Sequence, residues 1–485
     1  MKNTTCALLL VALAGGCTTD NGNYEYTRLN TIEIDGFAAD TTYRVDQFDT
    51  LVIDPAPRFA AGPLTDLSHE WKINHEVIST APVLRAPVTL APNTGTAYYE
   101  AGLRVTDNAT GLKYYKNFKV IVTTSITTGL FILSERADET ARLSFQRRDK
   151  PGGTLVHDLF EEANPAFGPL GKKPRQVYYS GLLGAELGVL CGEGERQLSI
   201  LNPATLALQR SLSGETIRGG YDGDFTPERL TLYMGGMIVG GGKLYNYNYM
   251  GNKAIYRPVP VDEDAYDFAG WAETNMTIDA YAWMTYDNKS EQFLQLEPGT
   301  DPLLYDKITP LTVEGDLSTA GQRFLAGGTG GTSAYTEVRA ILYNSAERKA
   351  YLYGITIVDD FDPVTWEIII NMTVTRLGEH ANLVDERSVC FYNAEYWYLA
   401  TGNTVKRLHE KGSAPLDWFT APRGEVTAMT VDKSGPAAKR LLVATRDGAK
   451  SYIHVIDIAT GKSLEPPLEM DGKIVSLLAK GTWKY

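Results

Sequence analysis

The stretch Leu130-Phe131-Ile132-Leu133 is a short apolar run of the kind that forms a buried strand, and similar runs recur down the chain. The recurrences are Leu187-Gly188-Val189-Leu190, Leu230-Thr231-Leu232-Tyr233, Ala280-Tyr281-Ala282-Trp283, Ala340-Ile341-Leu342-Tyr343, Val389-Cys390-Phe391-Tyr392, Ala428-Met429-Thr430-Val431 and Ile474-Val475-Ser476-Leu477-Leu478. Their mean spacing is about 49 residues, which is close to the length of a four-stranded propeller blade. The pattern predicts a β-propeller over residues 126–485, with seven blades favoured and six or eight left open.

Turn signals between the apolar runs support the same prediction. Asn202-Pro203-Ala204-Thr205 and Asp457-Ile458-Ala459-Thr460 each follow a strand-like segment with a tight turn of a type common in propeller blades. The last segment, Gly472 to Tyr485, is too short to be a blade. It predicts a strand that completes the first blade and closes the ring, which protects the sheet edges.

Residues 32–125 alternate apolar and polar positions, as strands with one buried face do. Trp71 and Ile73 share one face, with Glu70 and Lys72 on the other. From Tyr98 to Thr106 the odd positions are mostly apolar and the even positions are mostly polar. No cysteine lies between residues 18 and 190, so this segment predicts a small β-sandwich that is held together by packing alone.

The N-terminus has the layout of an export signal. Met1-Lys2 is positively charged, Ala7–Ala14 is apolar, and small residues precede Cys17. This layout resembles the lipobox of bacterial lipoproteins, which implies cleavage before Cys17 and lipidation of that cysteine; an ordinary secretory signal is the alternative. The sequence therefore predicts a signal and lipidated cysteine over residues 1–17 and a flexible tether over 18–31. A β-sandwich over 32–125 and the propeller follow.

Composition limits the possible partners. The chain has 485 residues and a formal net charge of -13, with 43% hydrophobic and 22% charged residues. Such an acidic protein without a basic run is not expected to bind nucleic acid. Cys6 is expected to leave with the cleaved signal and Cys17 to be lipidated, so two other cysteines remain, Cys191 and Cys390. Their apolar neighbours favour buried strand thiols, with one disulfide left as the alternative.

The whole architecture resembles the PKD-like family of outer-membrane lipoproteins. Three segments carry the resemblance: Asp20–Tyr24 in the tether, Leu103–Asn108, and Gly111–Val120, which is similar to that family's last sandwich strands. The resemblance implies an immunoglobulin-like module followed by a propeller, anchored in the outer membrane of a Gram-negative bacterium. It also implies an accessory role beside a starch-utilisation-type importer, that is, a TonB-dependent barrel with its lid lipoprotein.

A search of the sequence for chemistry finds no catalytic motif, and no cofactor or metal site is expected. The acidic runs Tyr221–Asp224 and Val261–Asp264 lack the spacing of an EF-hand, so solvated loops are favoured over calcium sites. The alternation of Leu244–Tyr249 puts three tyrosines on one strand face, where packing between blades is the favoured role.

Two aromatic segments of the propeller are the candidate ligand-binding loops. Pro258–Asn275 carries Tyr266, Phe268 and Trp271, and the glycine-rich segment Gly327–Thr332 is followed by Tyr335. The favoured function is a surface-anchored, non-enzymatic lipoprotein that binds a glycan or an oligopeptide, or scaffolds the importer. The alternatives are a propeller hydrolase or lyase that acts on an extracellular polymer, and a purely adhesive or structural protein.

Overall fold

The computed structural model describes residues 31–60, 66–93, 95–149, 153–181, 185–221, 223–232, 235–249, 251–259, 265–274, 282–298, 305–330, 336–364, 367–393, 395–410, 414–432 and 439–481. These residues form two compact units that consist mainly of strands. The smaller unit contains the described residues up to Val45, Thr50–Pro87 and Gly95–Ile121. The larger contains Asp46–Asp49, Val88–Thr94 and the chain from Val122 onward.

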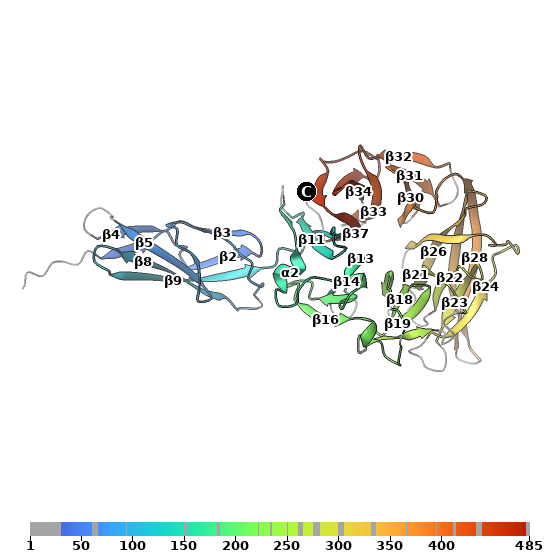
Figure 1. Cartoon of the computed structure of the whole chain (residues 1–485), viewed down its shortest axis with the longest axis horizontal. Coiled ribbons are helices and arrows are strands. Elements are labelled where there is room, and N and C mark those ends of the chain that lie inside the picture. The colour runs from blue at the N-terminus through green and yellow to red at the C-terminus, as the bar shows by residue number, and fades with distance from the viewer. Residues whose placement is uncertain are drawn as a thin grey trace, which may run out of the picture. The chain divides into compact units, whose positions relative to one another are not determined.

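The first nine strands form a β-sandwich. They are β1 (Ile32–Asp35), β2 (Thr42–Asp46), β3 (Thr50–Ile53), β4 (Ala56–Phe59), β5 (Leu67–Ile73), β6 (Glu76–Ser79), β7 (Leu84–Pro87), β8 (Tyr99–Asp107) and β9 (Lys113–Thr123). Five of them make an antiparallel sheet in the order β2-β9-β8-β5-β6. The two-stranded sheets β1-β4 and β3-β7 complete the fold. Figure 1 labels β2, β3, β4, β5, β8 and β9 of this unit.

The sandwich core is built from the apolar face that the sequence alternation predicts. Trp71 of β5 and Leu103 of β8 are buried cross-strand partners, and Phe118 packs edge-on against Trp71 at a centroid distance of 6.1 Å. The indole Nε1 of Trp71 donates a 2.8 Å hydrogen bond to the backbone oxygen of Ala81. The indole is therefore buried without loss of its one hydrogen bond.

Seven four-stranded antiparallel sheets are found among the described residues that follow, and Figure 1 shows them arranged as the blades of a ring. Blade one contains β37 (Lys473–Lys480), β10 (Gly129–Glu135), β11 (Ala141–Arg147) and β12 (Leu155–Val156). Blade two contains β13 (Lys172–Ser180), β14 (Glu186–Glu193), β15 (Leu198–Leu201) and β16 (Leu208–Leu212). Blade three contains β17 (Arg229–Leu232), β18 (Gly236–Gly240), β19 (Lys243–Tyr247) and β20 (Ile255–Val259).

Blades four to seven repeat this arrangement. Blade four contains β21 (Phe268–Thr274), β22 (Trp283–Asp287), β23 (Gln292–Glu297) and β24 (Lys307–Leu311). Blade five contains β25 (Arg323–Gly330), β26 (Thr336–Asn344), β27 (Lys349–Asp362) and β28 (Glu367–Ala381). Blade six contains β29 (Val389–Asn393), β30 (Tyr396–Thr401), β31 (Thr404–His409) and β32 (Leu416–Thr420). Blade seven contains β33 (Glu425–Asp432), β34 (Arg440–Asp447), β35 (Lys450–Asp457) and β36 (Leu468–Asp471). The prediction of an all-β chain with a sandwich and a seven-bladed propeller is confirmed.

Each pair of neighbouring blades shares a buried apolar cluster. Tyr245, Tyr247 and Tyr249 belong to the cluster between blades two and three, which confirms that this tyrosine row packs between blades. The short helix α2 (Leu159–Ala163) adds Leu159 and Phe160 to the cluster between blades one and two. A single 3₁₀ turn, η1 (Gly214–Thr216), follows blade two. The propeller is thus stabilised mainly by burial between its blades.

The predicted turns and thiols also have the expected local structure. The side-chain oxygen of Asn202 accepts hydrogen bonds from the backbone N–H groups of Ala204 and Thr205, and Asp457 does the same for Ala459 and Thr460. Asn and Asp favour such turns because their side chains can cap the backbone two and three residues ahead. Both remaining cysteines are free: Cys191 is buried in β14, whereas Cys390 in β29 is only half-buried.

Candidate functional site

The structure places the predicted aromatic candidates differently from the sequence prediction. Cys17 and Tyr335 lie outside the described residues. Phe268 and Trp271 are part of strand β21, not of an exposed loop, and are 4% and 0% exposed. Tyr266 is half-buried, and its ring stacks on Phe268 at a centroid distance of 5.0 Å. The expectation of a loop is therefore wrong for Phe268–Thr274, because inter-blade packing uses these side chains.

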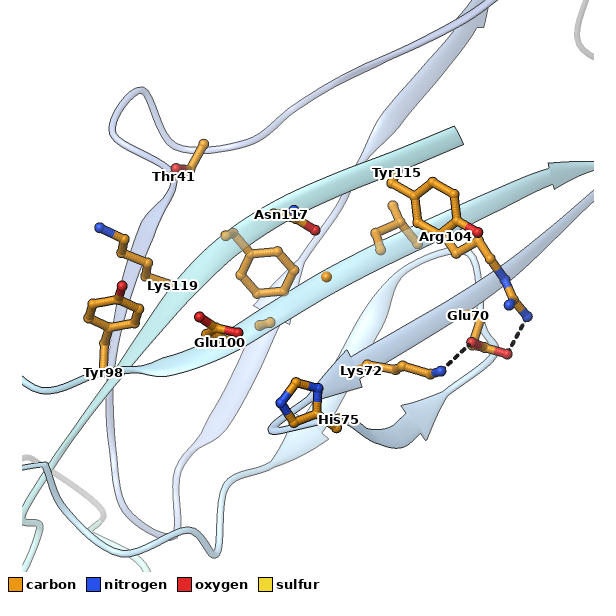
Figure 2. A pocket seen from close by; sticks show the side chains of 14 residues that line it. Thr41, Glu70, Lys72, His75, Tyr98, Glu100, Arg104, Tyr115, Asn117 and Lys119 are labelled. Atoms are coloured by element: carbon orange, nitrogen blue, oxygen red, sulfur yellow. Dashed lines mark hydrogen bonds and ion pairs between the residues drawn. The ribbon is translucent and has the colours of Figure 1, made fainter. Parts of the chain in front are cut away.

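A groove of about 600 Å³ lies on the sandwich. Its walls come from strands β5, β8 and β9, together with Thr41, Tyr98 and the β5–β6 turn. It occupies the face of the five-stranded sheet opposite the Trp71 core, because strand side chains alternate between faces. Its volume is within the range of small-molecule binding sites. We take this groove, shown in Figure 2, as the candidate functional site.

Gly102 forms the middle of the groove floor. In the antiparallel register it lies between Lys72 of β5 and Asn117 of β9. A Cβ atom at this position would lie 3.3 Å from the side-chain oxygen of Asn117 and 3.7 Å from the backbone oxygen of Lys116. The absence of a side chain at the centre of the sheet leaves a hollow between the longer side chains on either side.

One end of the groove is a charge-paired cluster beside an exposed ring. Glu70 Oε1 forms an ion pair with Lys72 Nζ at 3.2 Å, and Glu70 Oε2 pairs with Arg104. Arg104 is also the cross-strand partner of Tyr115, which is 65% exposed. Both carboxylate oxygens of Glu70 are therefore held by cations, and Figure 2 shows these two contacts next to the Tyr115 ring.

The other end of the groove repeats this combination of charge and aromatic ring. Lys119 Nζ lies 4.6 Å from the ring centroid of Tyr98, which is a cation–π distance, and Tyr98 is 42% exposed. Glu100 is the cross-strand partner of Lys119. The backbone N–H of Lys119 donates to the backbone oxygen of Thr41 at 2.8 Å, which ties this end to the residue before strand β2. The two tyrosines stand at opposite ends of the row of side chains in Figure 2.

The tight turn between β5 and β6 carries His75 at the side of the groove. Asn74 and His75 both have positive φ, at 50° and 70°, as the two central residues of a type I′ hairpin turn require. The backbone N–H of Asn74 donates to the oxygen of Glu100 at 2.8 Å, which fixes the turn against β8. The groove is thus built on three paired strands and on one tight turn.

The groove offers hydrogen-bond donors, acceptors and two exposed rings, and its charges nearly cancel. Its charged side chains are three cations, Lys72, Arg104 and Lys119, and two carboxylates, Glu70 and Glu100. Among the described residues, no group of three histidine, cysteine or acidic side chains could hold a metal ion. The described helices include none long and apolar enough to cross a membrane.

Sequence reasoning found the residues of the groove but not the groove itself. The alternation put Glu70, Lys72, Tyr98, Glu100 and Arg104 on the face away from the core, which the structure confirms. The sequence prediction nevertheless places the candidate ligand-binding segments in the propeller and none in the sandwich. A glycine in the middle of a strand whose outward positions are otherwise charged is the signal that could have indicated a hollow.

Several solved structures resemble the chain at low sequence identity. A quinonprotein alcohol dehydrogenase-like protein of Bacteroides thetaiotaomicron has a TM-score of 0.49 at 13% identity, covering 94% of this chain and 100% of its own. A protein from Lactobacillus plantarum has a TM-score of 0.42 at 12% identity, covering 72% and 98%. An auxiliary nutrient binding protein of Bacteroides thetaiotaomicron has a TM-score of 0.31 at 12% identity, covering 93% and 90%.

No curated protein sequence matches this chain at a significant level. A family model gives a match that begins at the predicted lipidated cysteine and continues through the sandwich. The match extends into the first strands of the propeller, so it includes every residue of the groove. Over residues 17–174 the chain matches the PKD-like family, which confirms the resemblance that its sequence indicates.

Proposed function

We propose that this protein is a lipid-anchored, non-enzymatic accessory protein of the outer membrane that captures a nutrient molecule on its sandwich. The observation that carries the proposal is the groove around Gly102, where polar side chains and two exposed tyrosines surround a hollow on a rigid sheet. Such a combination of a few fixed polar groups with aromatic surface is typical of ligand sites. Capture is then followed by transfer to a TonB-dependent barrel and its lid lipoprotein.

The contacts within the groove support binding more than catalysis. Both carboxylate oxygens of Glu70 are engaged by cations, Lys72 and Arg104, so this side chain already has partners within the groove. Among the predicted propeller candidates, Phe268 and Trp271 are buried in clusters between blades, and Tyr266 packs against the cluster that contains Phe268. We therefore assign recognition to the sandwich instead of to the propeller segment Pro258–Asn275.

The test is calorimetry on residues 18–485 with pooled glycans and pooled oligopeptides. We expect binding by the wild type and its loss in Gly102→Val, in which the new side chain fills the floor of the groove. Valine is well suited to a strand, and Gly102 does not have positive φ, so the fold should be retained. Thr106→Val, on the same face of β8 but outside the groove, is the matched control.

Two results would overturn the proposal. One is equal binding by wild type and Gly102→Val, which would remove the groove from recognition. The other is cleavage of the pooled polymers by the purified protein, which would make it an enzyme. Pull-downs from native outer membranes test the transport role separately, and we expect a barrel transporter among the proteins that co-purify.

A further inference from the structure

We propose that the ligand of the groove is a neutral oligosaccharide, whose rings lie along β8 between Tyr98 and Tyr115. This inference rests on the proposed function and specifies its ligand class. It follows from three features of the groove: its place on the face of a sheet, its nearly balanced charges, and the separation of its two exposed rings.

The place of the groove disfavours a peptide. Peptides commonly bind sheets by adding a strand at an edge, where unpaired backbone groups are exposed. Strand β8, which forms the floor, is a central strand, and its residues are paired with β5 on one side and β9 on the other. A ligand on this face must therefore be recognised by side chains alone.

The charges in the groove disfavour an ionic ligand. Both oxygens of Glu70 are held by Lys72 and Arg104, and Lys119 lies opposite Glu100 in the register. At the Tyr115 end, a ligand carboxylate would have to displace Glu70 from its cations, and a ligand ammonium would have to displace the cations from Glu70. At the Tyr98 end, a ligand charge would meet Lys119 and Glu100 side by side, so attraction to one is opposed by repulsion from the other. Anions are also disfavoured by the net charge of -13.

Paired charges remain good hydrogen-bond partners for hydroxyl groups. A hydroxyl both donates and accepts, so it can bridge a carboxylate and a neighbouring ammonium without breaking their pairing. Lys72, Asn117 and Glu100 present such donors and acceptors on the two sides of Gly102. Sugar rings combine a rim of hydroxyls with apolar C–H faces, and exposed tyrosine rings suit such faces because their own surface is amphipathic.

The separation of the two rings requires more than one sugar. Glu100 and Arg104 lie on the same face of β8, four residues apart, which corresponds to about 13 Å along the strand. Tyr98 lies beyond Glu100, and Tyr115 lies beside Arg104. One sugar ring cannot contact both tyrosines, whereas a short chain of linked rings can. Affinity should therefore rise from disaccharides to tetrasaccharides of the same linkage.

The experiment uses residues 18–485, fluorescently labelled, on two arrays. One array carries neutral glycans of two to six sugars together with uronic-acid oligosaccharides, and the other carries oligopeptides. We expect the wild type and Thr106→Val to retain neutral tetrasaccharides or longer chains. Gly102→Val should lower this signal at least tenfold and Tyr115→Ala at least fivefold. Phe167→Ala, which removes an exposed ring of the propeller, should leave it unchanged.

The outcomes separate the ligand class from the proposed function. The wild type could instead retain peptides or uronic-acid oligosaccharides, and not neutral glycans. If Gly102→Val abolishes that retention, the inference is wrong and the groove remains a binding site. If Gly102→Val changes nothing on either array, both the inference and the proposed function are wrong. Circular dichroism and thermal melting of each variant show whether a lost signal reflects the groove or a lost fold.

Discussion

Phe131 of β10 and Leu478 of β37 are direct partners across antiparallel strands, so one blade joins the first and last segments of the propeller. The pairing extends from Gly129 with Lys480 to Glu135 with Lys473. Ile474 and Leu477 of the last strand are buried in the cluster between blades seven and one. This closure confirms the prediction made from the short C-terminal segment.

Removal of one buried side chain of the closing strand should destabilise the whole ring. We expect Ile474→Ala to lower the free energy of unfolding by about 2–5 kcal/mol, since it leaves a cavity between two blades. Leu464→Ala, at a 51% exposed position between β35 and β36 of blade seven, should change it by less than about 0.5 kcal/mol. Denaturant titration measures both, and equal midpoints for the two variants would mean that β37 does not hold the ring closed.

A buried ion pair links blades five and six. Arg339 Nε of β26 lies 2.8 Å from Glu410 Oε2, and both side chains are less than a tenth exposed. Tyr392 of β29 donates a hydrogen bond to the same carboxylate. Removing one partner of a buried pair leaves an uncompensated charge, so Glu410→Gln should cost about 3–5 kcal/mol of stability. Lys450→Gln, from an exposed pair with Glu469, should cost less than about 1 kcal/mol.

The same pair predicts a pH dependence. Burial raises the pKa of Glu410, but the hydrogen bonds from Arg339 and Tyr392 outweigh burial, so its folded-state pKa lies below the usual value. A carboxyl whose pKa is depressed in the folded state stabilises the fold above its unfolded pKa, about 4.3 for glutamate. This stability is lost as the pH falls through the folded-state pKa. Melting temperatures from pH 6 to 3 should fall less steeply in Glu410→Gln than in the wild type; parallel curves would contradict this assignment.

The propeller was predictable because its strands are buried on both faces, which gives continuous apolar runs at blade-like spacing. The runs do not mark the same strand in every blade, however. Leu130–Leu133 lies in β10, the second strand of its sheet, whereas Leu230–Leu232 lies in β17, the first of its sheet. The average spacing indicated the number of blades, although the position of each run within its blade varied.

Two features could not be read from the sequence. A register shift between Phe268 and Ala272 interrupts the alternation of β21, so the segment looks like a loop although it is a strand. The groove depends on Lys72, Gly102 and Asn117 lying side by side across three strands. Alternation shows which side chains leave the core, but the register that brings separate strands together is a tertiary property.

We expect Trp271 to stabilise the propeller, in contrast to the ligand-binding role predicted from the sequence. Its ring is fully buried and stacks on Phe324 of β25 at a centroid distance of 4.8 Å. A Cβ atom at Gly327 would lie 2.4 Å from the indole nitrogen. Trp271→Ala should cost about 3–5 kcal/mol of unfolding free energy, and Gly327→Ala should also destabilise. Phe167→Ala, which removes an exposed ring, is the matched control. If Trp271→Ala weakens ligand binding and leaves the stability unchanged, this assignment is wrong.

The two free thiols should be unreactive in the folded protein. Burial raises the pKa of both Cys191 and Cys390 to about 12. At pH 8 about one thiol in ten thousand is then ionised, and only the thiolate reacts. Residues 18–485 should show no fast reaction with a disulfide reagent in buffer and two reactive thiols in denaturant. Rapid labelling of the native chain would contradict the assignment, and Cys390→Ser would then show which thiol had reacted.

Lipidation of Cys17 is the last prediction, and the proposed role at the membrane depends on it. Small residues from Ala14 to Gly16 precede the cysteine, and a polar tether follows it. Stable anchoring needs more than one acyl chain, because a single chain binds membranes only marginally. Metabolic labelling with a radioactive fatty acid should mark the wild type and Cys6→Ala, which changes a cysteine inside the signal, but not Cys17→Ala. If all three proteins are labelled equally, or none is, the chain is not anchored through Cys17.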